Sequence, residues 1–301
     1  MTEKCGLVAV LGAPNAGKST LVNALVGQKV AIVSAKAQTT RARLMGIALA
    51  QEGEDRTQII LADTPGLFEP KRRLDRAMVA AAWEGAEGAD VIALVVDGKG
   101  GIGPKVHAIL ESLAKRPEPK ILILNKVDIA DKPKLLGHAA KLNEALAFDE
   151  TFFVSAQTGD GVPELKAVLA ARMPEGPWHF PEDQVSDATD RMIAAEVTRE
   201  QLYLQLHAEL PYASAIDTEK YSERPDGSVE IHQQILVARE TQRAIVLGKG
   251  GARIKEIGAR ARAELSRIMG VSVHLYLHVK VNPKWEEDRS LYREIGLEWV
   301  E

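Results

Sequence analysis

The first half of the chain alternates short apolar runs with longer amphipathic stretches. The apolar runs are rich in β-branched residues and span 7–12, 58–66, 91–98, 120–128 and 151–156. The stretches between them are long enough for crossover helices, for example 17–27, 71–88, 103–115 and 132–147. Continuous apolar strands connected by helices are typical of a parallel sheet that is covered on both faces. The pattern therefore predicts an α/β domain with a mostly parallel sheet over residues 1–173.

The pattern changes after a proline-rich stretch. Residues 173–183, MPEGPWHFPED, contain three prolines. Prolines break helices, so we expect a linker over residues 174–186. Asp226-Gly227 beyond it is a strong hairpin signal. The predicted order begins with a helix (187–209), a hairpin (212–239) and a short helix (241–246). A glycine loop (248–251), a longer helix (251–268), a strand (271–281) and one or two last helices (284–299) follow. This order indicates a second domain, of the α+β class, over residues 187–301.

Composition excludes several classes of protein. Cys5 is the only cysteine, so a disulfide framework and a multi-cysteine zinc site are excluded, and the chain suits a reducing cytosol. The longest apolar runs, such as 91–96 and 121–124, are far too short to cross a membrane. The net charge is −4, yet residues 239–267 carry eight Lys and Arg against three Glu. That confined basic patch suits either an anionic partner or a solvated helix face.

A glycine loop follows the first predicted strand. GAPNAGKST, residues 12–20, fits the pattern G-x-x-x-x-G-K-[ST] between a strand and a helix. Its glycines let successive backbone N–H groups face a phosphate, and the helix N-terminus adds favourable partial charge. Lys18 should reach the β- and γ-phosphates, and Ser19 should bind Mg²⁺. The predicted phosphate contacts in this loop are Gly12, Ala13, Pro14, Asn15, Ala16, Gly17, Lys18, Ser19 and Thr20.

A second motif selects the base. NKVD, residues 125–128, ends a predicted strand at the sheet edge where such folds bind ligands. Asp128 can accept two hydrogen bonds from the ring N–H and the amino group of guanine, a donor pair that adenine lacks. Asn125 and Lys126 would brace the loop and cover the base. A backbone N–H at the end of the next strand can bind the guanine O6, and the candidates are Ser155, Ala156 and Gln157.

Two further segments complete a nucleotide site. DTPG, residues 63–66, ends another strand; Asp63 would hold Mg²⁺ through a water, and the Gly66 N–H would sense the γ-phosphate. Thr39 and Thr40 lie in the loop after the first helix, and we expect Thr40 to bind Mg²⁺ only when the γ-phosphate is present. The predicted phosphate contacts of this part are Asp63, Thr64, Pro65, Gly66 and Leu67, and the predicted Mg²⁺ ligands are Ser19, Thr40 and Asp63.

In this order, the segments are similar to the GTPase signature of the translation-factor-related P-loop proteins. The stretches AQTTRARLMGI (37–47) and DTPGLFEPKRRLDRAM (63–78) resemble the Era family of bacterial GTPases, and the resemblance continues through FPEDQ (180–184) to the C-terminal domain. It implies a GTP-hydrolysing switch followed by a type II KH domain. It also implies assembly of the small ribosomal subunit, binding to the 3′ end of its RNA, and a cytoplasmic location with weak peripheral association with the inner face of the cell membrane.

The second glycine loop, GKGG at 248–251, has a different pattern. Four residues are too few to wrap a triphosphate, and no Ser or Thr follows the lysine to hold Mg²⁺. A G-x-x-G loop between two short helices clamps a single-stranded nucleic-acid backbone in KH domains; the alternative is a plain helix cap. Ile254 and Ile257 should face the domain core. The predicted RNA contacts are Gly248, Lys249, Gly250, Gly251, Arg253 and Lys255.

Leu67 stands where many GTPases carry a glutamine that orients the attacking water. Leucine neither donates nor accepts a hydrogen bond, so hydrolysis needs another device or is slow. Asn15 suggests one, because an asparagine at this loop position can hold K⁺ beside the phosphates together with backbone carbonyls of residues 30–40; alternatively it merely braces the loop. We expect slow intrinsic turnover, Mg²⁺ as cofactor and K⁺ bound at Asn15.

Two other functions stay open at this point. One is a binding module that uses GTP only as a structural ligand, with negligible turnover. The other is a metabolic P-loop kinase, which would have no use for NKVD at residues 125–128. The expected partners are GTP or GDP, the small ribosomal subunit and its RNA. No DNA partner is expected, and we expect a monomer.

Overall fold

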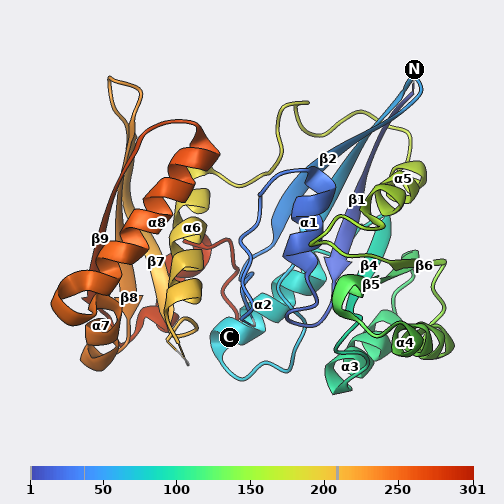
Figure 1. The fold of residues 1–301 in the computed structure, drawn as a ribbon, viewed down its shortest axis with the longest axis horizontal. Coiled ribbons are helices and arrows are strands. Elements are labelled where there is room, and N and C mark those ends of the chain that lie inside the picture. Colours follow the sequence, from blue (N-terminus) through green and yellow to red (C-terminus); the bar gives the residue numbers. More distant parts are fainter. Residues whose placement is uncertain (1, 37, 208–209) are drawn as a thin grey trace. The chain divides into compact units, whose positions relative to one another are not determined.

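A computed structural model describes residues 2–36, 38–207 and 210–301 (Figure 1). Residues 208–209, at the end of the stretch expected to be helical from 187, lie outside the described residues. The chain divides into two compact units, Met1–Asp187 and Ala188–Trp299.

The first unit is built on a six-stranded sheet. The strand order is β2 (Leu44–Glu52), β3 (Asp55–Asp63), β1 (Glu3–Leu11), β4 (Val91–Asp97), β5 (Lys120–Asn125) and β6 (Glu150–Phe153). Only β2 runs antiparallel to its neighbour, β3; the other pairs are parallel. The mostly parallel sheet predicted from the sequence is therefore confirmed. Its carboxyl edge brings together the ends of β1, β3, β4 and β5.

Strand β2 was absent from the strands expected from the apolar runs. Its sequence, LMGIALAQE, has few β-branched residues because small residues alternate along it. Gly46 shows one reason why this strand contains small residues. A Cβ atom there would lie 2.8 Å from Val22 and 3.0 Å from Val26 of helix α1, so the small residue lets the helix pack closely on the sheet.

Helices cover both faces of this sheet (Figure 1). Helices α1 (Lys18–Val26) and α5 (Val162–Arg172) contribute Leu21 and Leu165 to one buried cluster. Helices α2 (Arg73–Glu84), α3 (Pro104–Leu113) and α4 (Lys132–Ala145) contribute Ala82, Ile109 and Leu142 to the other. The two clusters bury opposite faces of the same strands, as expected for continuous apolar strands.

The stretch expected to be a linker is bound to the first unit along its length. The Cys5 N–H donates to the Pro174 carbonyl at 3.0 Å, and the Ile47 N–H donates to Val185 at 2.9 Å. Between these points, the buried Gln58 side chain binds the backbone of His179 and Phe180 through three hydrogen bonds of 2.8–3.1 Å. The compact first unit accordingly extends to residue 187.

The second unit has a three-stranded sheet in the order β7 (Ser214–Glu223), β8 (Val229–Val237) and β9 (Val273–Val281). Strand β8 is antiparallel to β7 and parallel to β9. Helices α6 (Asp190–Gln205), α7 (Glu240–Leu247) and α8 (Ala252–Met269) pack on this sheet through two apolar clusters. A short α9 (Arg289–Glu294) follows β9.

The order helix, two strands, helix, GKGG loop, helix, strand was predicted and is confirmed. As expected, Ile257 is fully buried in the core of this unit and Ile254 packs against it. No helix within the described parts of the chain is long and apolar enough to cross a bilayer.

Candidate nucleotide and RNA sites

The first glycine loop lies between β1 and α1, and the protein's own atoms pack tightly against its glycines. Gly17 has φ 93°, and a Cβ atom there would lie 2.2 Å from Asn125 Nδ2. Gly12 has φ 153°, and a Cβ there would lie 2.3 Å from the Val95 carbonyl. Both conformations and both close approaches require glycine. The loop is therefore held in one shape before any ligand enters.

Lys18 is buried inside this loop. Its Nζ donates to the carbonyls of Gly12 at 3.2 Å and Ala13 at 3.1 Å. Burial lowers the pKa of Lys18 to about 8, although the nearby Asp63 carboxylate raises it in part. Desolvation disfavours the charged form of an amine. A phosphate group at this position would place a negative charge beside the buried ammonium and so favour its charged form.

Three oxygen-bearing side chains meet beside the loop. Ser19 Oγ donates to Asp63 Oδ2 at 2.7 Å and lies 2.8 Å from Thr40 Oγ1. Thr40 Oγ1 is 3.5 Å from the same carboxylate oxygen. Thr39 instead bonds with Ser34 Oγ and the Lys36 carbonyl. The structure thus brings together Ser19, Thr40 and Asp63, whereas the neighbouring Thr39 hydroxyl bonds within its own loop.

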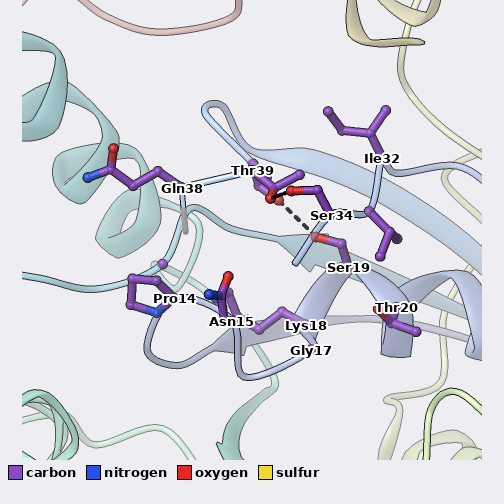
Figure 2. A pocket seen from close by; sticks show the side chains of 13 residues that line it. Pro14, Asn15, Gly17, Lys18, Ser19, Thr20, Ile32, Ser34, Gln38 and Thr39 are labelled. Atoms are coloured by element: carbon purple, nitrogen blue, oxygen red, sulfur yellow. Dashed lines mark hydrogen bonds between the residues drawn. The ribbon is translucent and has the colours of Figure 1, made fainter. Parts of the chain in front are cut away.

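A pocket opens above the glycine loop (Figure 2). It encloses about 390 Å³ of empty space, part of it open to solvent, between the loop at 14–20 and the segments 32–34 and 38–40. Figure 2 shows Ser34 and Thr39 pointing toward one another on one side of it, with the Ser19 hydroxyl nearby. Gly66 also lines the pocket. A Cβ atom on Gly66 would lie 2.8 Å from the backbone of Pro14, so glycine lets DTPG approach the loop.

The side chains of Thr64 and Leu67 point away from this pocket. Thr64 is fully buried and donates to the Val10 carbonyl at 2.7 Å. Leu67 packs in an apolar cluster at 3% exposure, and its N–H donates to the Gly12 carbonyl at 3.0 Å. These contacts join β3 to β1 and the glycine loop, and the phosphate contacts of the two residues stay a prediction.

Asn125 joins two loops at the carboxyl edge. Its Nδ2 donates to the Ala16 carbonyl at 3.0 Å, and its Oδ1 accepts the Ala156 N–H at 3.0 Å. Ser155 is buried, and its Oγ accepts the Thr158 N–H at 3.2 Å. The NKVD segment, the glycine loop and the SAQ segment (155–157) are thus parts of one rigid edge, as a shared ligand requires.

Lys126 and Asp128 lie at the open side of this edge. Lys126 has a left-handed backbone with φ 66°. Its Nζ donates to the Asn15 carbonyl at 2.6 Å and to Asp97 Oδ2 at 2.7 Å. Asp128 lies in the single turn Val127–Ile129, and its side chain is exposed. An exposed carboxylate at this edge can pair with the edge of a base.

The second glycine loop has an open geometry. Gly248, Gly250 and Gly251 have φ values of 70°, 60° and 78°. A Cβ atom on Gly250 or Gly251 would meet nothing within 4 Å. The loop joins the C-terminus of α7 to the N-terminus of α8, whose free N–H groups favour anions. A Cβ atom on Gly248 would lie 2.8 Å from Arg253 Cβ, so the room for another chain lies at Gly250 and Gly251.

Comparison with known proteins agrees with both sites. A family model described as a 50S ribosome-binding GTPase matches residues 7–126, and a KH domain model matches residues 209–286. GTPase Era of Erythrobacter litoralis is 65% identical over the whole length of both chains. GTPase Era of a Bradyrhizobium species is 55% identical over 98% of this chain and 95% of its own.

The chain belongs to the Era family of GTPases.

Two solved Era structures have the same fold. A crystal structure of Era in complex with MgGDPNP and nucleotides 1506–1542 of 16S ribosomal RNA has a TM-score of 0.90, at 37% identity over 98% of this chain and 99% of that one. A variant of Aquifex aeolicus Era bound to GDP and AlF₄⁻ has a TM-score of 0.91, at 37% identity over 97% and 99%. The expected Era resemblance is confirmed, and the protein is a GTPase with a C-terminal KH domain.

The charges around the Era-family KH loop fall into two groups. Arg243, Arg260 and Arg267 each pair with a glutamate three or four residues away on the same helix. Arg253 donates to the Ile245 carbonyl at 2.9 Å and so caps the end of α7. Lys249, Lys255 and Arg262 are exposed and form no ion pair within the described ranges. The cations open to a partner therefore extend from the glycine loop along α8.

Sequence reasoning missed some residues of the nucleotide site. Ile32 and Gln38 line the pocket, but the segment around them matches no motif beyond its threonines. Asp97 holds Lys126, and the only sequence signal for it is a carboxylate directly after an apolar strand. Such residues become visible only when the strand order places their loops side by side.

Proposed function

We propose that this Era-family GTPase uses GTP binding and hydrolysis as a switch. We further propose that its KH domain binds the 3′ end of small-subunit ribosomal RNA and assists assembly of the small subunit. The observation that carries the proposal is the pairing of a closed phosphate loop at 12–20 with an open G-x-x-G loop at 248–251. A relative of the same fold is described with both a GTP analogue and 16S ribosomal RNA.

The proposed Mg²⁺ ligands are Ser19, Thr40 and Asp63. Their oxygens lie within 2.7–3.5 Å of one another, and hydroxyl and carboxylate oxygens suit this cation. When bound, Mg²⁺ neutralises charge between the β- and γ-phosphates. Lys18 would bind the same oxygens, and the N–H of Gly66, which lines the pocket, would contact the γ-phosphate. Thr40, on the segment that lines the pocket, responds to whether that phosphate is present.

Guanine recognition rests on the NKVD edge. Asp128 accepts hydrogen bonds from the base, and Lys126 covers it. A site built on paired hydrogen bonds strongly rejects a base that lacks the matching donors. In an Asp128→Asn variant, binding of GTP should weaken while xanthosine triphosphate competes better, because xanthine carries a carbonyl oxygen, an acceptor, where guanine carries its amino group. Unchanged competition by xanthosine triphosphate would contradict the assignment.

We propose Asn15 as a ligand of an activating K⁺. The residue is exposed with φ 64°, and its Nδ2 lies 3.1 Å from the Ala35 carbonyl. Rotating the amide would place Oδ1 beside that carbonyl, so that two oxygens face one cation next to the phosphates. Leu67 takes no part, since its side chain lies in the apolar core. Turnover is accordingly slow without a cation or partner that stabilises developing charge.

The K⁺ proposal is tested by turnover in KCl and NaCl at equal ionic strength, for the wild type and Asn15→Ala. The wild type should be faster in KCl, and the variant should lose that difference. Equal wild-type rates in the two salts would remove the cation from the mechanism. The proposal also places the protein in the cytoplasm as a monomer, with weak peripheral membrane association that rests on the family resemblance alone.

The function is tested by measuring GTP and ATP binding and turnover with and without an RNA of the small-subunit 3′ end. We expect guanine preference, slow basal hydrolysis and RNA binding that depends on the loop at 248–251. Binding of GTP with no turnover under any condition would favour a module that uses GTP only as a structural ligand. Absence of RNA binding would overturn the ribosomal part of the proposal.

A further inference from the structure

The Lys126 ammonium lies between two oxygens from different parts of the nucleotide site. Its Nζ donates to Asp97 Oδ2 at 2.7 Å and to the Asn15 carbonyl at 2.6 Å. Asp97 is the last residue of β4, and the strand order places its end beside that of β5. Asn15 belongs to the phosphate loop. One cation thus links the end of β4, the base-recognition segment and the phosphate loop.

Asp97 is itself held in place. Its Oδ1 accepts the N–H groups of Lys99 at 2.9 Å and Gly100 at 3.0 Å. Partial burial would raise the pKa of Asp97, but the hydrogen bonds from Lys126 and these two N–H groups outweigh it and hold the pKa below its usual value. The carboxylate is therefore ionised at neutral pH, and its second oxygen has one fixed direction.

The turn that carries Asp97 is fastened to the base-recognition strand. The Gly98 N–H donates to the Asn125 carbonyl at 2.8 Å. A Cβ atom on Gly98 would lie 2.8 Å from that carbonyl and 2.7 Å from Leu135 Cδ1. Backbone packing therefore sets where the turn that carries the Asp97 carboxylate lies relative to the NKVD segment.

We propose that Asp97 is a positioning residue for guanine nucleotide binding: it fixes the Lys126 side chain over the base and against the phosphate loop. The inference rests on the proposed role of Lys126 in covering the base. Lysine is a point charge on a flexible four-carbon stem. Without the Asp97 carboxylate, the ammonium keeps only the Asn15 carbonyl, and the stem is free to leave the base face.

This role predicts a particular pattern of selectivity. Lys126 would contact the face of the base, whereas Asp128 would pair with its edge. Guanine and hypoxanthine have the same face but differ at the edge, because hypoxanthine lacks the amino group. Loss of Asp97 should therefore weaken the binding of GTP and of inosine triphosphate by the same factor. Loss of Asp128 should instead change the ratio between them.

The test measures the dissociation rate of a fluorescent GDP from the wild type, Asp97→Asn, Lys126→Met and the double variant. A partly exposed charge-assisted hydrogen bond should be worth about tenfold in this rate. The double variant should release GDP no faster than Lys126→Met, because both changes remove the same contact. Turnover at saturating GTP should be unchanged in Asp97→Asn, so KM rises while kcat does not.

Asp149→Asn is the matched control, because Asp149 pairs with Arg172 at 2.8 Å in the same unit. It should leave GDP release unchanged and alter the thermal stability of the nucleotide-free protein as much as Asp97→Asn does. Asp97→Glu keeps the charge and should recover part of the loss. A rate within twofold of wild type in Asp97→Asn, or additive effects in the double variant, would overturn the proposal. Failure of the wild type to prefer guanine nucleotides would instead overturn the proposed function.

Discussion

The two glycine loops of this protein use the same residue for opposite purposes. In the loop at 12–20, an added Cβ atom on Gly17 would lie 2.2 Å from Asn125. In the loop at 248–251, an added Cβ atom on Gly251 would meet nothing within 4 Å, although its φ of 78° also favours glycine. The first glycine makes room for the protein itself. The second leaves room for a partner.

The lysines of the two loops differ in the same way. Lys18 is buried and bonded to two carbonyls of its own loop, whereas Lys249 is exposed. A closed loop with a desolvated cation is preorganised for a small ligand of fixed shape. An open loop with a solvated cation suits a flexible polyanion, whose affinity depends on salt. The environment of a glycine-lysine motif therefore decides its ligand class more than the motif does.

The largest loss of nucleotide affinity is expected from adding a side chain to the first loop. Gly17→Ala forces a residue with a side chain into φ 93° and against Asn125, so nucleotide affinity should fall by about a hundredfold or more. Gly27→Ala is the matched control, because Gly27 ends the same helix at φ 90° with nothing within 4 Å. Titration of both variants with a fluorescent GDP checks the prediction. Equal losses in the two would mean that only backbone strain matters.

The next largest effect is a loss of RNA affinity after a substitution in the second loop. Gly251→Asp places a negative charge where an RNA backbone passes and should weaken RNA binding roughly ten- to hundredfold, with GTP hydrolysis nearly intact. Gly270→Asp is the control, because Gly270 ends α8 at φ 70° with nothing within 4 Å. Filter binding with a 3′-end RNA compares the two. If RNA binding survives Gly248→Asp and Gly251→Asp together, the KH loop is not the RNA site.

A smaller effect follows from the pKa of Lys18, which burial lowers to about 8. Phosphate favours the ammonium, so above pH 8 nucleotide binding must take up a proton, and affinity should fall by up to about tenfold per pH unit. Calorimetry at pH 9 in buffers of different ionisation enthalpy should detect this uptake. Lys18→Met should abolish it.

Without nucleotide, the contribution of Lys18 to the free energy of unfolding should rise with pH between 8 and 10.5, because the folded state binds fewer protons there than the unfolded state.

The smallest effect belongs to Lys249. Its replacement by alanine removes one phosphate contact, so the slope of log affinity against log salt should become shallower by about 0.7. Arg267→Ala serves for comparison, because Arg267 pairs with Glu264 at 2.8 Å near the other end of α8. RNA titrations at four salt concentrations measure both slopes. Identical slopes for wild type and Lys249→Ala would place the lysine outside the contact.

Much of this organisation follows from the sequence for physical reasons. Buried parallel strands are apolar along their whole length, so runs such as 91–98 are visible without a structure. Strand β2 is not, because close packing against α1 requires Gly46 in place of a β-branched residue. The distinction between Thr39 and Thr40 also needs coordinates, since neighbouring residues with the same hydroxyl differ only in direction. Asp97 belongs to no motif and becomes significant only when β4 lies beside β5.

Each glycine loop serves its own ligand. The most direct test measures both affinities on the same preparations of wild type, Gly17→Ala and Gly251→Asp: GDP binding in one titration, and binding of the 3′-end RNA without nucleotide in the other. Gly17→Ala should lose GDP binding and keep RNA binding, and Gly251→Asp should lose RNA binding and keep GDP binding. Loss of RNA binding in nucleotide-free Gly17→Ala, or of GDP binding in Gly251→Asp, with the fold intact, would contradict it.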